Sequence, residues 1–210
     1  MATTAEINSF IELLGGLAVN ETKRRIANGE GFVVPSVCIA QSAMETGYGT
    51  APLMIKANAF FGIKAGSSWT GKVFVASTYE VAENGVEYDT VATFRAYDNL
   101  EDSVRDYYDL IVNNSRYAGG VSHYPDDVKT AYDTLYAIWS GGYATETDYV
   151  GEVYNIITRR ELTQFDEQIG GEYTPTAPNQ VNTPYYPPVT VSESEAVKFI
   201  FDKIGTKTLN

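Results

Sequence analysis

Hydrophobic residues recur at helical spacing through the first sixty residues of the chain. Apolar positions 7, 10, 11 and 14 share one face of a helix predicted over residues 4–15. A second, shorter helix is predicted over residues 20–27, and Pro35 suits the first turn of a third, which ends at Gly47 and Gly49. A short fourth helix is predicted over residues 52–57.

The pattern changes to that of strands after residue 70. Residues 73–81 and 86–94 are rich in β-branched and aromatic side chains, and Glu83-Asn84-Gly85 lies between them. An Asn-Gly pair flanked by two such runs is a strong signal for a β-hairpin. One hairpin is therefore predicted within an otherwise helical chain.

Helical spacing returns after the hairpin. Three more helices are predicted, with Asn99 capping residues 100–111, Pro125 opening a helix that continues through Trp139, and a capping box of Thr145 and Asp148 ahead of residues 149–157. These segments and the earlier ones predict a mainly α domain with one small β-hairpin lobe.

The composition shifts near residue 166, so the folded domain is predicted to cover residues 1–165. Five of the eight prolines follow between residues 175 and 188, which predicts an extended linker over residues 166–191. Residues 192–210 then predict a short amphipathic helix with apolar positions Val197, Phe199, Ile200 and Ile204. Because it is too short to fold alone, we expect it to dock on the main domain, bind a partner chain or begin a further domain.

The charge balance and the rare residue types exclude several classes of function. A net charge of −12 without a basic stripe argues against binding nucleic acid or an anionic membrane. The single cysteine, Cys38, permits no internal disulfide. With the single histidine, His123, it leaves too few ligands for a His and Cys zinc site, so no metal or cofactor is expected. We expect Cys38 to be a buried, inert thiol rather than the partner of His123 in a catalytic pair.

The segment AQSAMETGYG, residues 40–49, places a carboxylate near the end of the third predicted helix. Gln41 and Glu45 are four residues apart and project from one face of that helix. The negative end of the helix dipole and apolar neighbours such as Met44 and Tyr48 both disfavour the charged form of Glu45. We therefore predict a raised pKa for Glu45, which suits a general acid near neutral pH. On position alone, an exposed glutamate without a role is the alternative.

The predicted hairpin supplies candidates for a second catalytic group. A glycosidase usually needs such a group to manage the positive charge that develops at the sugar ring. Glu80 lies on the first predicted strand and Asp89 on the second, and a hairpin beside the helix of Glu45 would form one wall of a cleft. For Asp89, a solvated strand residue is the favoured interpretation, and Glu83 and Glu87 are expected to solvate the turn.

Four segments, in order along the chain, carry a resemblance to a known family. AQSAMETGYG resembles the helix motif of glucosaminidases of glycoside hydrolase family 73, which are bacterial and phage enzymes that cut peptidoglycan. ANAFFGIKAG resembles the family's Asn-Asn-x-Phe-Gly-Ile-Lys segment. TYEVAENGVEYDTVATFRAYDNLEDSVRDYYDLI resembles its Thr-x-Glu hairpin, its Phe-Arg-x-Tyr motif and a following acidic helix. GGYATETDYVGEV resembles its Tyr-Ala-Thr-Asp segment, and the matches together span roughly residues 10–162.

The resemblance implies a lysozyme-like α+β domain in which a substrate cleft separates the helices from the hairpin. It implies hydrolysis of the β-1,4 bond between N-acetylglucosamine and N-acetylmuramic acid, so a peptidoglycan glycan strand is the expected partner. Glu45 takes the general-acid position and Glu80 that of the second carboxylate. The expected substrate-binding residues are Gln41, Tyr48, Asn58, Phe61, Gly62 and Tyr143.

The sequence departs from the family pattern at two positions. Ala59 replaces the second asparagine of the Asn-Asn pair, which removes one polar contact. Glu146 replaces the aspartate after Tyr-Ala-Thr, and if that carboxylate caps the following helix, the longer side chain does so less well. Neither change touches Glu45, so activity is still expected.

Several alternatives stay open at this point. The attack can come from a carboxylate, from an activated water, or from the acetamido group of the substrate itself. A muramidase or lytic transglycosylase acting on the same polymer is one rival function, and an inactive wall-binding virion protein is another. The N-terminus lacks a signal-peptide pattern, so we expect a phage lysin released by holin pores or a lysin carried by the virion.

Overall fold

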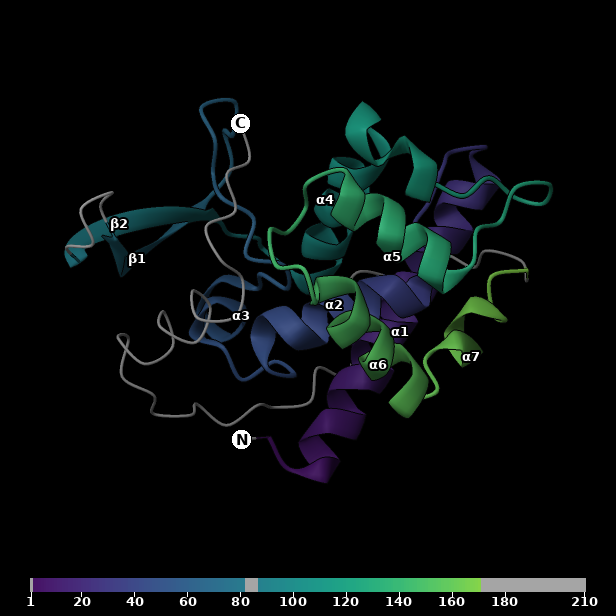
Figure 1. The fold of residues 1–210 in the computed structure, drawn as a ribbon, viewed down its shortest axis with the longest axis horizontal. Coiled ribbons are helices and arrows are strands. Elements are labelled where there is room, and N and C mark those ends of the chain that lie inside the picture. Colours follow the sequence, from purple (N-terminus) through teal and green to yellow (C-terminus); the bar gives the residue numbers. More distant parts are fainter. Residues whose placement is uncertain (1, 82–86, 171–210) are drawn as a thin grey trace.

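The computed structural model describes residues 2–81 and 87–170, which form seven α-helices, one 3₁₀ helix and one β-hairpin (Figure 1). The described elements in chain order are α1 Thr4–Ala27, α2 Pro35–Thr46, α3 Pro52–Ala57, β1 Val73–Val81, β2 Glu87–Arg95, α4 Leu100–Val112, η1 Ser115–Gly120, α5 Ala131–Ser140, α6 Tyr149–Arg159 and α7 Thr163–Asp166. The prediction of a mainly α chain with one hairpin is confirmed.

Helix α2 lies at the centre of the helical lobe. Every residue of α2 except Met44 is buried, and α1, α5, α6 and α7 all contact it. Its sequence, PSVCIAQSAMET, consists mainly of apolar and small side chains, which allows neighbouring helices to approach on all sides. Cys38 is fully buried in this core, where burial raises the pKa of its thiol, whereas His123 is exposed. The expectation of a buried thiol is confirmed.

Helix α1 is one continuous helix, whereas two helices were predicted over its length. Gly15, in the middle of the helix, serves close packing rather than helix termination. A Cβ at Gly15 would lie 2.2 Å from the ring of Phe165, so only glycine lets α7 pack on α1 at this point. A contact from a distant segment therefore explains a residue type that weakens a helix locally.

Helix α7 caps the N-terminus of α2. The N-cap residue Val34 offers no side-chain acceptor, and Pro35 has no N–H. The carboxylate of Asp166 accepts hydrogen bonds from the backbone N–H of Ser36 at 2.7 Å and from its hydroxyl at 2.6 Å. Ile169 is also buried in the core, so packing continues beyond residue 165. The boundary at residue 165 stays a prediction.

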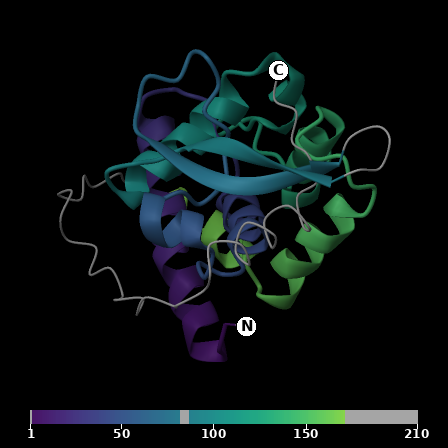
Figure 2. The ribbon, with the colours of Figure 1, turned by 90° about the vertical axis from the view of Figure 1, so that its left-hand side faces the viewer.

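The predicted hairpin is confirmed as an antiparallel pair in which Val73 pairs with Arg95 and Val81 with Glu87 (Figure 2). Its base is joined to the helical lobe by backbone hydrogen bonds, from Ala65 N–H to the Thr93 carbonyl and from Arg95 N–H to the Ile63 carbonyl, both 2.8 Å. A small apolar cluster then packs the hairpin against α3. It consists of Leu53, Ala57, Ala59, Ala76 and Phe94.

A polar cluster fixes the same base to α4. Asp106 accepts two hydrogen bonds from one Arg95 nitrogen at 2.8 and 2.9 Å, and a third from the Tyr97 hydroxyl at 2.6 Å. The Arg95 guanidinium also lies 4.7 Å from the centre of the Trp69 ring, within the range of a cation–π contact. The hairpin is therefore attached at its base by a few specific contacts.

One predicted helix start and one predicted helix cap are wrong. Pro125 does not open a helix, because His123 and Asp127 pair through two 2.8 Å backbone hydrogen bonds and hold the chain in a turn. The helix begins six residues later, at Ala131, where the Thr130 side chain accepts the N–H of Asp133. The capping box ahead of α6 is also absent, since its N-cap, Asp148, makes no side-chain cap bond.

Some predictions fall outside the described residues. They are the turn at residues 83–85, the linker beyond residue 170 and the helix over residues 192–210 with its four apolar positions. Among the helices that the structure describes, none combines the length and the apolar character needed to cross a bilayer.

Candidate active site

Glu45 lies in the last turn of α2, and its side chain is almost completely enclosed. Its exposed fraction is 4%, so the carboxyl group is shielded from bulk water rather than displayed on a solvated helix face. The position therefore rules out the alternative of an exposed glutamate. The helix ends at Gly47, where the chain enters three consecutive left-handed residues with φ of 57°, 59° and 82° at Gly47, Tyr48 and Gly49.

Those φ values account for the glycines in the ETGYG motif. Glycine adopts left-handed backbone without strain, whereas Tyr48 pays a cost for it. The turn is tied down by Thr46, whose hydroxyl donates to the Ser42 carbonyl at 2.7 Å and accepts the Gly49 N–H at 2.9 Å. The turn thus fixes the direction of Tyr48 relative to Glu45.

Gln41 is buried one turn before Glu45, and both ends of its amide are bonded. Its nitrogen donates to the Tyr149 hydroxyl at 2.7 Å, and its oxygen accepts from the Tyr107 hydroxyl. The side chain therefore links α2 to α4 and α6. Its predicted role as a direct substrate contact stays a prediction, and the observed bonds favour a positioning role.

Three phenols lie within electrostatic reach of Glu45. Burial raises the pKa of Tyr143 and of Tyr149 well above the ordinary value, and the charge of Glu45 raises both further. Burial is also the main reason that the pKa of Tyr107 is raised, with a smaller contribution from Glu45. All three therefore remain neutral and retain a proton to donate. Tyr143, predicted as a cleft residue, is 3% exposed and packs at 6.1 Å on the Tyr149 ring.

The backbone at Gly62 passes directly beside the carboxyl group. A Cβ at Gly62 would lie 4.0 Å from Glu45 Oε2, and the residue has a φ of 55°. The preceding ring, Phe61, is buried and stacks on Tyr107 with centroids 4.0 Å apart. Phe61 thus packs in the core, and Gly62 is the part of this segment that approaches Glu45.

The second predicted carboxylate lies on the hairpin. Glu80 belongs to β1 and pairs in register with Tyr88, and Asp89 belongs to β2 and pairs with Tyr79. The side chains at these positions are outside the described part of the structure. The role of Glu80 and its separation from Glu45 therefore stay predictions.

The sequence model of the glucosaminidase family, described as mannosyl-glycoprotein endo-beta-N-acetylglucosaminidase, matches residues 21–162, more than half of the chain. The chain belongs to the glucosaminidase family. The match covers α2, which carries Glu45, and also the hairpin, α4 and α6.

Relatives of this glucosaminidase domain include peptidoglycan hydrolase FlgJ of Salmonella typhimurium, 29% identical over 74% of this chain and 48% of that protein. Exo-glucosaminidase LytG of Bacillus subtilis is 29% identical over 75% of this chain and 53% of its own length. The chain thus spans about half the length of these curated relatives.

Among solved structures, the catalytic domain of the autolysin Auto from Listeria monocytogenes aligns with a TM-score of 0.65 and 27% identity. The alignment covers 79% of this chain and 90% of that domain. The predicted lysozyme-like architecture is confirmed.

The chain departs from the family pattern at the two positions that the sequence indicates. The position of the second asparagine is occupied by Ala59, which is buried in the cluster between α3 and the hairpin. The neighbouring Asn58 donates its side-chain amide to the backbone carbonyls of Tyr97 and Asp98 at 3.1 and 3.3 Å. Asn58 thus fastens the segment, and its predicted contact with substrate stays a prediction. Glu146 makes no side-chain cap bond to α6.

Sequence reasoning missed two residues that support the site. The sequence pattern placed Tyr107 and Tyr149 in predicted helices without assigning them a role, and the structure shows that their hydroxyls hold Gln41. The available signal was chemical: a fully buried tyrosine needs a hydrogen-bond partner, and Gln41 is a buried amide.

Proposed function

We propose that this protein hydrolyses the β-1,4 bond between N-acetylglucosamine and N-acetylmuramic acid in bacterial peptidoglycan, with Glu45 as the general acid. The observation that carries the proposal is the enclosure of Glu45 beside the Gly62 backbone and within reach of three neutral phenols. The names of the relatives, a peptidoglycan hydrolase and an exo-glucosaminidase, support the same substrate and class of reaction.

In the proposed reaction, protonated Glu45 donates its proton to the glycosidic oxygen as the bond to the sugar ring breaks. Positive charge develops at the ring, and either the acetamido oxygen of the substrate or a water activated by Glu80 attacks the anomeric carbon. Attack by water completes the hydrolysis directly, whereas attack by the acetamido oxygen forms a cyclic intermediate that a water then opens. Gln41 and its two tyrosine partners hold α2 in place, so that the carboxyl group keeps one orientation.

The test is product analysis on purified peptidoglycan. Mass spectrometry should find fragments ending in reducing N-acetylglucosamine, whereas a muramidase yields reducing N-acetylmuramic acid and a lytic transglycosylase an anhydro product. Glu45→Gln keeps the shape of the side chain but removes the proton, so the rate should fall about 10²–10⁴-fold with an unchanged melting temperature. A variant that keeps half of the wild-type rate would remove Glu45 from the acid role.

A second experiment tests Glu80. Azide can replace an activated water but cannot supply a proton, so it should rescue Glu80→Ala and leave Glu45→Ala inactive. An undiminished rate in Glu80→Gln would assign the second role to Asp89 or to the acetamido group of the substrate.

Delivery to the wall, as a holin-released phage lysin or as part of a virion, stays a prediction.

A further inference from the structure

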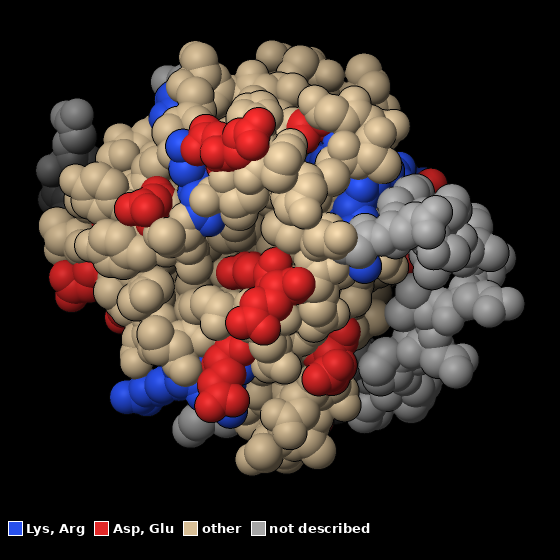
Figure 3. Space-filling model, turned by 90° about the vertical axis from the view of Figure 1, so that its right-hand side faces the viewer, with Lys and Arg blue, Asp and Glu red and all other residues tan. Residues whose placement is uncertain are grey.

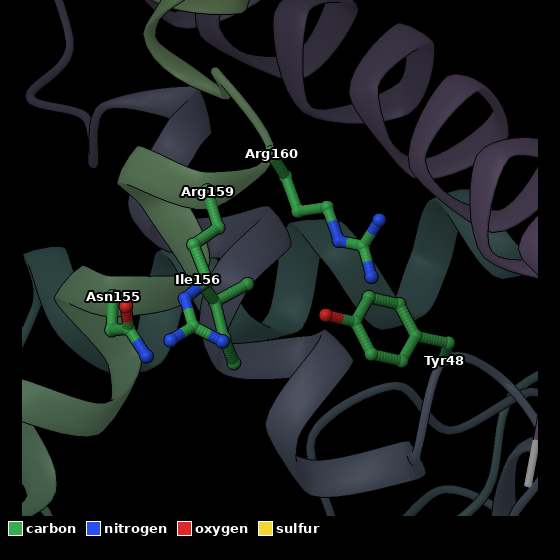
Figure 4. A pocket seen from close by; sticks show the side chains of 5 residues that line it. All are labelled: Tyr48, Asn155, Ile156, Arg159 and Arg160. Atoms are coloured by element: carbon green, nitrogen blue, oxygen red, sulfur yellow. The ribbon is translucent and has the colours of Figure 1, made fainter.

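A pocket of about 420 Å³ opens between the end of α6 and the turn that follows α2 (Figure 4). Its lining residues are Tyr48, Asn155, Ile156, Arg159 and Arg160. Four of these five side chains can donate hydrogen bonds, and two carry a permanent positive charge. No step of the proposed reaction uses this pocket.

The two guanidinium groups stand out in a chain with a net charge of −12. On the face in Figure 3, acidic groups gather near the centre and basic groups lie mainly toward the edges. Arg159 is exposed and Arg160 is half-buried. Within the described residues, no carboxylate forms an ion pair with either of them. No carboxylate among the described residues therefore neutralises their positive charge.

The location at the carboxyl end of α6 explains part of this arrangement. A positive charge is favoured there by the helix dipole. The dipole does not explain why the Tyr48 hydroxyl and the Asn155 amide line the same space as the two arginines (Figure 4). Four donors around one space indicate an anionic ligand.

The pocket is held in shape before any ligand arrives. Tyr48 is fixed by its left-handed backbone, by an edge contact with the Phe10 ring at 5.9 Å, and by the Arg160 guanidinium 5.7 Å from its own ring centre. Ile156 adds an apolar wall. Planar guanidinium groups pair with both oxygens of a carboxylate, and the apolar wall suits a short aliphatic group beside it.

The position of Tyr48 places the pocket beside the active-site helix. Tyr48 lies three residues after Glu45, in the turn that ends α2. In peptidoglycan, N-acetylmuramic acid carries a short peptide with free carboxylates. Each residue of an extended peptide spans about 3.3–3.6 Å, so its second or third residue lies on the order of 10 Å from the sugar.

We propose that this pocket binds a carboxylate of the peptide stem next to the bond being cut. The proposal rests on the proposed function and extends it, because it makes peptide-bearing glycan the preferred substrate. Arg159 and Arg160 bind the carboxylate, Tyr48 and Asn155 donate to it, and Ile156 contacts the adjacent aliphatic group.

The kinetic test compares two substrates, glycan strands that retain their peptide stems and strands stripped of them by an amidase. Arg159→Gln should raise KM about tenfold on the peptide-bearing strands and leave kcat and the stripped strands unaffected. Arg160→Gln should act in the same direction. Arg105→Gln, an equal charge change at a half-exposed position on α4, is the matched control and should change neither substrate.

A binding experiment separates this proposal from the proposed function. In the Glu45→Gln background, the full chain should bind a disaccharide with its peptide more tightly than the bare disaccharide, and adding Arg159→Gln should abolish the difference. A wild type that cuts neither kind of strand would refute the proposed function, and the binding difference would still decide the pocket.

Two results would overturn the proposal. One is an equal loss on peptide-bearing and stripped strands, which would mean that the arginines serve the glycan or the fold. The other is that the effect of Arg159→Gln on KM disappears on walls that keep their peptides but have lost their teichoic acid. The ligand of the pocket would then be a phosphate of the teichoic acid.

Discussion

Different kinds of contact hold the helical lobe and the hairpin in place. In the helical lobe, α2 is enclosed by other helices, its first turn is capped by Asp166 and its last turn ends at Gly47. The hairpin is attached at its base, and its outer valines at positions 73, 75 and 91 are 49%, 59% and 60% exposed. Segments with few buried apolar contacts open at lower free-energy cost than a core does.

This difference separates the two proposed catalytic groups. Glu45 lies in the packed helical lobe, whereas Glu80 stands on a hairpin that a few specific contacts attach at its base. The acid is therefore expected to keep its geometry under conditions in which the hairpin opens. Three predictions test this contrast, in order of expected effect.

The largest effect is expected from Arg25→Ala in the helical lobe. The buried Arg25 side chain pairs with Glu21 at 2.7 Å and with Asp109 at 2.5 Å, and so joins α1 to α4. Breaking a buried ion pair should lower the free energy of unfolding by about 3 kcal/mol, the low end of the usual range because Arg24 still pairs with Glu21. Chemical denaturation measures the loss.

The control for Arg25 is an exposed pair. Lys72→Ala removes the partner of Asp98, and the two side chains are 67% and 69% exposed. This change should lower the free energy of unfolding by less than about 1 kcal/mol. Equal losses for the two variants would contradict the contrast between the lobes.

A smaller, local effect is expected from Asp106→Ala at the hairpin base. The change leaves the Arg95 guanidinium and the Tyr97 hydroxyl without their common acceptor, which costs about 2 kcal/mol. Hydrogen exchange should accelerate at the Ala65 and Arg95 amides while α2 keeps its protection, and wall-lytic activity should fall. Asp106→Asn retains an acceptor oxygen and should show a partial effect. Uniform acceleration across both lobes would mean that the hairpin is not a separate unit.

The smallest effect concerns the cap of α2 and depends on pH. Burial raises the pKa of Asp166 to about 6, although the two hydrogen bonds from Ser36 act in the opposite direction. The folded state therefore binds this proton more tightly than the unfolded state, and the group adds stability as the pH falls through 6. Between pH 7 and pH 5, the wild type should gain about 1 kcal/mol relative to Asp166→Asn.

Thermal unfolding of both proteins across this range measures that difference. Asp126→Asn, at an exposed surface position, serves as the control and should run parallel to the wild type. A gain in the wild type as the pH rises, rather than falls, would show that the hydrogen bonds to Ser36 outweigh burial.

Local signals predicted most of the elements, and tertiary contacts account for the exceptions. Asn99 caps α4, Pro35 opens α2, and the Asn-Gly pair lies between two paired strands, because each of these signals acts within a few residues. The predicted break in α1 failed because the need for glycine at position 15 arises from Phe165, far away along the chain.

The candidate site also combines features that local signals predict with features that depend on tertiary contacts. The ETGYG motif indicated Glu45 and the turn after it, since a helix end and its glycines are local features. The bonds from Gln41 to Tyr107 and Tyr149 could not be predicted from spacing, because they join three helices. The pocket at Arg159 and Arg160 was missed for the same reason, since its donors come from two segments more than a hundred residues apart.

The cap supplied by Asp166 also bears on when the proposed site around Glu45 can first form during synthesis. The helix that carries Glu45 is made early in synthesis, but the side chain that completes its first turn follows 130 residues later. Domains generally fold as units while the chain emerges from the ribosome. A nascent chain that stops short of α7 therefore carries every proposed catalytic residue without the finished helix, so we expect the proposed site to be complete only after the whole domain has been translated.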